Sequence, residues 1–332
     1  MKEKQTRKQI FSFLCVTIGL LVLFFFSINL GSIQLTVPQL LRGLFIEYDR
    51  DVASVYDLRF PRILISMMAG ASLAVAGALF QAVLKNPLAD PGLLGISSGA
   101  GFAVVLATIL FPQLYFLTPA FSFLGGLLVF ALVYGLAWKG TVSPLRIILM
   151  GIAMQSLFSG LSEALHSMSG GNVSGVASIV EGNITMKNWH DVHLMAVVSV
   201  IGLVLALLCA KSCNLCGLED KTVRGLGVNI DRVRLIVSIT AVFLVGGCTA
   251  IVGPVSFIGL LVPHIRRIFV GSDHRKLLPF SALLGAFLFL LADTMGRTLI
   301  RPHEMNASVI LAIVGGIAFV ILLRKNGGIY GK

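Results

Sequence analysis

The most constraining feature of the sequence is a succession of apolar runs, each close to the length that crosses a lipid bilayer. The first extends from Ile10 to about Leu30, and similar runs recur along most of the 332 residues. A membrane-spanning helix needs about 20 mainly apolar residues, so a chain of this length has room for roughly ten crossings and little else. Only 12% of the residues are charged, against roughly 25% in soluble domains. The sequence therefore predicts an all-α integral membrane protein and excludes a soluble enzyme.

Charges or turn residues separate ten apolar segments. They cover approximately residues 10–30, 63–84, 92–111, 116–138, 147–168, 192–210, 235–252, 254–270, 277–296 and 305–323. The first segment exceeds the 7–15-residue apolar core of a signal peptide and lacks a small-residue cleavage site, so we expect it to be retained as a helix. The ten segments can be divided into two sets, each with one leading helix followed by four more. This division suggests an inverted repeat of helices 2–5 and 7–10. We expect a single transmembrane domain over residues 1–332.

The distribution of basic residues orients this bundle. With ten crossings and a cytoplasmic N-terminus, 19 of the 26 lysines and arginines fall on the cytoplasmic side, as the positive-inside rule requires. Both termini are then cytoplasmic. The net charge of +11 does not indicate nucleic-acid binding, because the basic residues form short clusters between apolar runs. The exceptions on the outer side are Arg42, Arg50, Arg59, Arg62, Lys187, Arg297 and Arg301.

Two connections are longer than turns. The outer one, residues 31–62, contains an apolar-periodic stretch from Val37 to Phe45 that could lie along the membrane interface. The inner one, residues 211–234, carries charges of both signs. Cys213 and Cys216 lie at its start, just after Cys209, but no histidine or further cysteine is nearby in the sequence. We therefore interpret them as reduced, apolar cysteines rather than as a metal or redox site.

Ionisable residues inside the apolar segments are few. Glu163 and His166 lie three residues apart on the outer half of the fifth segment and so share one helix face. A charge in the bilayer is costly and usually faces a cavity, so this pair either lines an outer vestibule or forms a local hydrogen bond. Nothing in the sequence resembles a Walker A loop, which indicates that ATP is not hydrolysed by this chain.

A proline- and glycine-rich motif follows the second segment, from Asn86-Pro87 through Pro91 to Gly95. Neither proline can donate a backbone hydrogen bond. A non-helical turn at membrane depth has to be buried in protein or face a watery cavity. By itself the motif indicates a transporter or a channel.

Taken with Arg59-Phe60-Pro61-Arg62 and Gln81, this motif resembles the signature of the iron-siderophore, haem and cobalamin permeases, the membrane subunits of type II ABC importers. Further similar stretches are Gly253-Pro254-Val255-Ser256-Phe257, Val262-Pro263-His264 and Leu291-Ala292-Asp293. The resemblance covers nearly the whole chain. It implies ten helices, a homodimer or a pair of similar permeases, two cytoplasmic ATPase subunits and an extracytoplasmic binding protein, in a bacterial cytoplasmic membrane. It implies no cofactor bound by the permease itself. We expect Pro263 and His264 to have a packing role.

The resemblance also gives the outer arginines a role. Binding proteins of this family present acidic residues to arginines of the permease, and the matching positions are Arg59, Arg62 and Arg297. Such contacts orient docking and speed encounter more than they raise affinity. The alternatives are contact with lipid headgroups or an intramolecular bridge to Asp57 or Asp293.

On the inner side, Leu218–Val228 resembles the coupling loop that seats in an ATPase, two short helices joined at a glycine turn. The residues expected to act there are Glu219, Asp220, Arg224, Gly225 and Gly227. The acidic pair would suit a helix start, and the glycines would allow a sharp reversal. The alternative is an ordinary solvated loop.

Substrate choice depends on cavity shape, which the sequence does not reveal. We predict ATP-driven import of an iron-siderophore complex, with haem and then cobalamin as the alternatives within the same family. An ion-coupled secondary transporter is the alternative from a different class. It would carry coupling acids near the membrane midplane, where this sequence has almost none.

Overall fold

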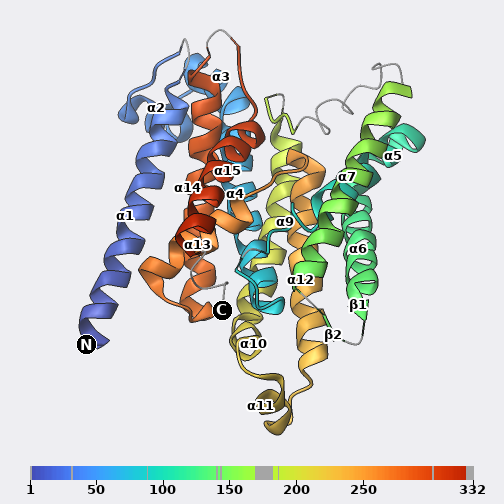
Figure 1. The fold of residues 1–332 in the computed structure, drawn as a ribbon. Helices are drawn as coiled ribbons and strands as arrows, with labels where there is room; N and C mark the ends of the chain where they lie inside the picture. The colour runs from blue at the N-terminus through green and yellow to red at the C-terminus, as the bar shows by residue number, and fades with distance from the viewer. Residues whose placement is uncertain are drawn as a thin grey trace.

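The computed structural model is a helical bundle (Figure 1). It describes residues 2–30, 33–87, 89–139, 141–142, 144–168, 182–185, 187–300 and 303–326. Within these ranges, seven helical spans are long and apolar enough to cross a membrane. The helices that carry them are α1 (Lys2–Ile28), α4 (Phe60–Val83), α6 (Thr118–Ala137), α7 (Pro144–Met168), α9 (Trp189–Leu208), α12 (Ile230–Val252) and α14 (His274–Thr298).

Three further helices coincide with the remaining predicted segments: α5 (Ile96–Leu110), α13 (Ile258–Val270) and α15 (Ala307–Asn326). Each of the ten predicted segments therefore overlaps one helix. However, α5 has 15 residues and α13 has 13. At 1.5 Å per residue, both reach about 20 Å, short of the ~30 Å hydrocarbon core. Because neither of these two helices crosses the core by itself, we call them the half-length helices. A non-helical motif rich in proline or glycine precedes each of them.

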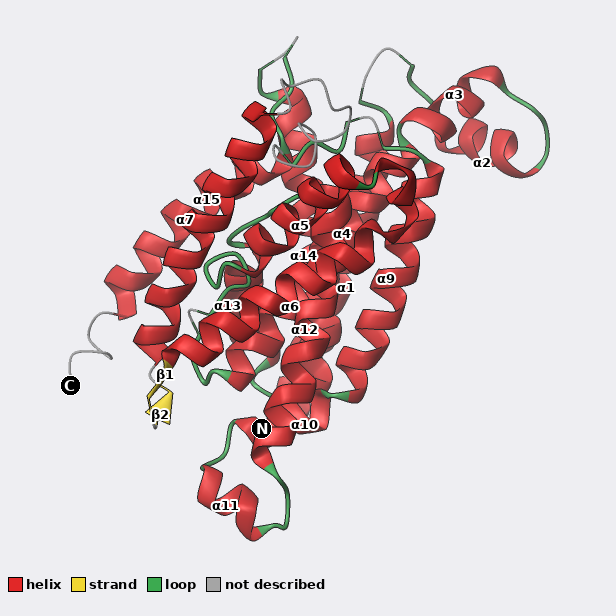
Figure 2. Ribbon diagram, turned by 90° about the vertical axis from the view of Figure 1, so that its right-hand side faces the viewer, coloured by secondary structure: helices red, strands yellow, loops and turns green. Residues whose placement is uncertain are grey.

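Short elements cap the two ends of the bundle. α2 (Val37–Phe45) and α3 (Arg50–Leu58) lie at one end, and α10 (Ala210–Cys216) and α11 (Asp220–Gly225) extend from the other (Figures 1 and 2). The start of α1 lies toward the α11 end. By the predicted orientation, α2 and α3 mark the outer end and α11 marks the inner end. The remaining elements are a 3-10 helix, η1 (Pro112–Leu117), and an antiparallel strand pair that the sequence did not predict, β1 (Trp138–Lys139) and β2 (Thr141–Val142).

The core of the bundle is built around α4, which packs closely against α14 and α12. Most of α4, α12 and α14 is buried, whereas α1, α6 and α7 mainly face outward. Close helix approach depends on small residues. A Cβ atom added to Gly70 of α4 would lie 2.1 Å from the carbonyl oxygen of Gly285 in α14, so larger side chains there would separate the two helices.

α2 is an amphipathic helix, as its sequence predicted. Its N-cap residue Thr36 accepts a hydrogen bond from the Gln39 amide, and Pro38 lies in the first turn, where a missing amide proton costs nothing. Leu40 is buried, while Leu41 and Phe45 are exposed. That the exposed stripe lies on the membrane stays a prediction.

Candidate functional site

The two half-length helices begin at one point in the interior, around the carboxylate of Asp90. This side chain is 1% exposed. Its Oδ1 accepts hydrogen bonds from the amides of Gly92, at 2.8 Å, and Leu93, at 3.3 Å, just before α5. It also accepts hydrogen bonds from the backbone of Phe257 and Leu260, at the start of α13. One carboxylate thus accepts hydrogen bonds from amides in the turn before α5 and from amides at the start of α13.

The motifs that precede these two helices are packed against each other. Gln81 Nε2 lies 3.5 Å from the Ala89 carbonyl and 3.4 Å from the Gly259 carbonyl, and so joins the two. A Cβ atom added to Gly259 would lie 2.8 Å from Pro91 Cδ. Phe257 has φ +70° although it is not glycine, and such strained backbone concentrates at functional sites. The predicted Asn86–Gly95 and Gly253–Pro254 motifs therefore meet at one junction.

Glycine is required at two ends of this junction. Gly95 has φ +74° and lies against α7, where an added Cβ atom would approach Gly151 O and Gln155 N to 2.9 Å. Gly253 ends α12 with φ +71° and ψ −174°, a backbone conformation that is essentially restricted to glycine. Pro263 is inside α13 and buried. The backbone of His264 belongs to the same helix, but its side chain lies outside the described part.

A small cavity beside the junction brings together two residues that the sequence suggested separately, Glu163 of α7 and Pro254. Its volume is about 90 Å³. The remaining lining residues are Ser98, Gly101, Val105, Ser159 and Ser162. Glu163 is exposed and His166, one turn further along α7, is half-buried. The cavity is polar enough and large enough to hold water around the carboxylate.

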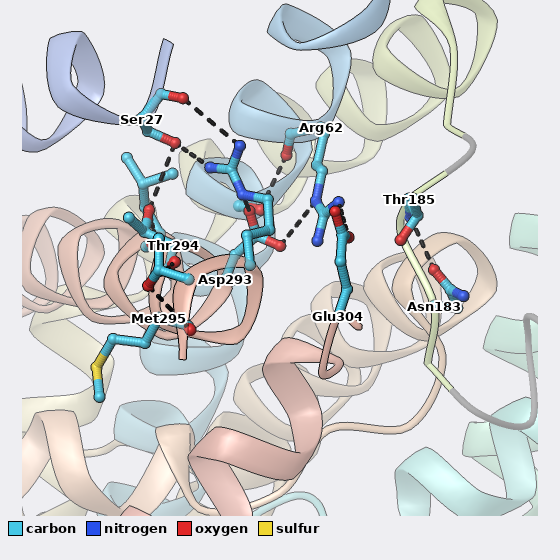
Figure 3. Close-up of polar contacts among 12 residues, drawn as sticks. Ser27, Arg62, Asn183, Thr185, Asp293, Thr294, Met295 and Glu304 are labelled. Carbon is cyan, nitrogen blue, oxygen red and sulfur yellow. Dashed lines mark hydrogen bonds and ion pairs between the residues drawn. The ribbon is translucent and has the colours of Figure 1, made fainter. Parts of the chain in front are cut away.

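The three outer arginines at the predicted docking positions have partners inside the protein. Figure 3 shows the partners of Arg62, which are Asp293 and Glu304. Arg62 donates from Nε to Asp293 Oδ1 at 2.9 Å and from NH1 to Glu304 Oε2 at 2.6 Å. Arg297 Nε lies 3.2 Å from Asp293 Oδ2, and its NH2 donates to the Ser27 hydroxyl. The side chains of Arg62 and Arg297 are 7% and 9% exposed, and that of Asp293 is fully buried. The intramolecular bridge to Asp293 is therefore present, whereas the docking role stays a prediction.

Arg59 stands apart from this network. Its NH1 donates to the carbonyls of Ile28, at 2.5 Å, and Ile33, at 2.8 Å, so it holds the end of α1 against the start of α4. The side chain is half-buried. No bridge from Arg59 to Asp57 is present in the described contacts. Sequence reasoning did not find Glu304 and Ser27, because neither belongs to a motif.

The inner loop contains two short helices, α10 and α11, and α11 projects beyond the bundle (Figure 2). The stretch Leu218–Val228 itself holds only α11, and its glycine turn leads into the long helix α12 rather than joining two short helices. Glu219 is the N-cap residue of α11 and is exposed. Gly227 has φ +76° and provides the reversal, whereas Gly225 is the last residue of α11 and has open space around its Cα. Arg224 pairs with Asp231 at 3.2 Å, both side chains being 64% exposed.

Asp220 connects this loop to the body of the protein. Its Oδ1 accepts from Lys85 Nζ at 2.9 Å and from Arg234 NH2 at 2.8 Å. The two cations hold the pKa of the Asp220 carboxyl below its ordinary value, the hydrogen bond from Lys85 being the largest cause. Sequence reasoning missed Lys85, which looked like one more cytoplasmic loop charge.

No metal-binding site is evident among the described residues. No group of three or more His, Cys, Asp or Glu side chains there is placed to hold a metal ion. Cys213 and Cys216 are buried, and neither forms a disulfide.

Comparisons with known proteins identify the family. Residues 19–325 match the FecCD transport family. Permeases from Staphylococcus aureus strains MSSA476 and MW2, named probable heme-iron transport system permease protein IsdF, are 41% identical over 314 residues, covering 95% of this chain and 95% of theirs. A solved structure described as an inward-facing conformation of a "metal-chelate type ABC transporter" matches with TM-score 0.79 and 28% identity, over 96% of this chain and 99% of that one.

A second solved structure, PsaBC from Streptococcus pneumoniae, has a TM-score of 0.59 at 16% identity, over 87% of this chain and 95% of that one, and supports the fold alone. The resemblance read from the motifs is confirmed, as is the expectation that ATP is hydrolysed in a separate subunit. The chain belongs to the FecCD transport family and is a multi-pass permease subunit of a bacterial ABC transporter.

Proposed function

We propose that this chain is the permease of a haem importer, working with a binding protein outside and ATPase subunits inside. The observation that carries this proposal is the 41% identity, over 95% of both chains, to permeases named for heme-iron transport. The structural relative described as a metal-chelate type transporter supports the same broader substrate class. An iron-siderophore complex, which we had expected first, becomes the second candidate.

The substrate test compares cargoes in one assembled complex. The permease, its ATPase and its binding protein are reconstituted in proteoliposomes, and ATP-driven uptake of haem, a ferric siderophore and cobalamin is measured. We expect saturable haem uptake that requires ATP and the binding protein. Uptake of the siderophore without uptake of haem would refute the haem assignment, and uptake driven by an ion gradient without ATPase would refute the importer class.

A second copy of the chain, or a similar permease, completes the transport route in this proposal. α7 and α15 lie on the same face of the molecule (Figures 1 and 2). Both helices expose apolar side chains, among them Leu157, Leu161, Ile313 and Ile317. A partner packed across that face would enclose the cavity that contains Glu163, as an ionisable group in a membrane requires.

Docking of the binding protein is best tested at Arg59, because Arg62 and Arg297 are held by Asp293. We expect Arg59→Gln to slow binding-protein association and to weaken its salt dependence, since charges at an interface rim act mainly on the on-rate. Arg42→Gln is the matched control, because Arg42 is an outer arginine whose side chain is 70% exposed and paired with Glu47 on the α2 side. Equal association rates for wild type and Arg59→Gln, with unchanged thermal stability, would refute the docking role of Arg59.

A further inference from the structure

A junction of three charged side chains lies at the base of α11. Lys85 Nζ donates to the Leu218 carbonyl at 2.6 Å and to Asp220 Oδ1 at 2.9 Å. Arg234, near the start of α12, donates to the same oxygen at 2.8 Å. The junction therefore joins the end of α4, the start of α11 and the first turns of α12, which lie up to 149 positions apart in the chain.

This junction contributes little to holding the fold together. The side chains of Lys85 and Asp220 are 38% and 40% exposed, and ion pairs with that much solvent contact contribute little to stability. Its geometry is nevertheless well defined, because three donor contacts converge on two neighbouring acceptors. A weak but specific contact of this kind is suited to setting the position of α11 rather than to stabilising the bundle.

The backbone of Lys85 supports the same conclusion. Its φ is +49°, a left-handed conformation that is strained for any residue other than glycine. The residue at this turn is not glycine, which would adopt the conformation without strain, but a lysine with a long cationic side chain. The strained backbone aims the chain into the Asn86–Gly95 motif while the side chain reaches α11.

The far end of that motif is the junction of the half-helices. Asp90 lies five positions after Lys85 and accepts hydrogen bonds from amides before α5 and at the start of α13. A displacement of α11 that moves Lys85 thus reaches, over a few residues, the point where two half-length helices meet. Coupling of this kind travels through contiguous packed and hydrogen-bonded groups.

We propose that Lys85 is a positioning residue that transmits movement of α11 to the Asn86–Gly95 motif and so to the ends of α5 and α13. The proposal rests on the proposed function and on the predicted coupling role of the Leu218–Val228 loop, through which an ATPase subunit would move α11. Lys85 touches neither substrate nor nucleotide in this arrangement; it acts through Asp220 and Leu218. The expected defect is a loss of transport per ATP rather than a loss of assembly.

The test uses the reconstituted importer with its binding protein and ATPase. Lys85→Met keeps the length of the side chain and removes its charge, and Asp220→Asn removes the acceptor charge without altering the backbone at Lys85. We expect both to assemble and hydrolyse ATP while substrate moved per ATP falls about 2- to 30-fold, the range of couplings carried by such networks. Lys85→Arg should retain most of the coupling, and the exchanged pair Lys85→Glu with Asp220→Lys should recover part of it.

Asp231→Asn is the matched control, since it breaks the Arg224–Asp231 pair in the same loop without touching Lys85. Unchanged transport per ATP in both Lys85→Met and Asp220→Asn would overturn the proposal, as would an equal loss in Asp231→Asn. Failure of the exchanged pair to recover any coupling would count against a direct link. Absence of ATP-driven uptake by the wild-type complex would overturn the proposed function and this inference with it.

Discussion

Removal of the buried charge at Asp293 gives the sharpest test of how the outer end of the bundle is held together. Asp293 is fully buried between two arginines, whose side chains are 7% and 9% exposed. Asp293→Asn preserves the shape of the side chain but removes the negative charge. Arg62 then keeps its ion pair with Glu304, whose side chain is 43% exposed, whereas Arg297 keeps only its neutral partner Ser27 among the described contacts.

The magnitude follows from this burial. Removing one partner of a buried ion pair costs about 3–5 kcal/mol, because an uncompensated charge stays in a region that water does not reach. Glu304→Gln removes a partner that is partly solvated and leaves Asp293 in place, so we expect a cost of about 1 kcal/mol or less. Replacing Arg297 by Met together with Asp293→Asn should recover part of the loss, since it removes one of the stranded charges.

The assay is a comparison of thermal midpoints for the purified permease in one detergent, with the folded fraction measured by size exclusion after heating. We expect the order wild type, Glu304→Gln, the Asp293→Asn/Arg297→Met double variant, and Asp293→Asn as the least stable. If Asp293→Asn lowers the midpoint no more than Glu304→Gln, the reasoning from burial is wrong. A double variant less stable than Asp293→Asn alone would refute the assignment of the loss to an unpaired arginine.

The remaining predictions concern the inner loop and the isolated subunit. Gly227→Ala should destabilise the loop by about 1–2 kcal/mol, because the φ of Gly227 is +76°. Gly225→Ala should be neutral or slightly stabilising, because a side chain there would enter open space. Limited proteolysis compares the two variants, and equal cleavage rates would contradict the predicted difference. The pKa of Asp220 is lowered in the folded protein, so its ion pairs stabilise the loop above the unfolded pKa and are lost only as pH falls through the lower folded value. We therefore expect that transport per ATP does not change through loss of this link between about pH 5 and pH 8. A pH dependence of transport per ATP in that range that disappears in Asp220→Asn would refute this. The purified chain alone should hydrolyse no ATP, and substantial turnover in a preparation free of ATPase subunits would contradict the separation of roles.

The helical segments were predictable from the sequence because one property, apolar length, decides both insertion and helix formation in a bilayer. The half-length of α5 and α13 was indicated by the prolines and glycines before them, though the sequence did not show that their starts meet. That meeting depends on contacts such as Gln81 with Gly259, 178 positions apart. Local patterns carry no information about pairs of this kind.

The outer arginines also show that local sequence patterns do not reveal contacts between distant residues. The charge count drew attention to these arginines, and the likeness to a docking motif suggested an external partner. The internal partner of Arg62 is 231 positions away, and only the packing of α4 against α14 brings it into reach. Lys85 was missed for a related reason, because a lysine in a cytoplasmic connection is the most ordinary residue in such a protein and its partner Asp220 lies 135 positions on.

The arrangement around Asp90 gives the predicted inverted repeat a physical meaning. α5 begins at this carboxylate and leads through η1 to α6, while α13 begins at the same carboxylate and leads toward the start of α14 near the inner end (Figure 1). Paired, interrupted segments at corresponding positions of two halves are the usual marks of a transport site. The Asp90 carboxylate accepts hydrogen bonds from the turn before α5 and from the start of α13, so the two halves are joined by a polar contact in the interior. Because Asp90 belongs to the first half and α13 to the second, neither half can tilt without straining or breaking that contact.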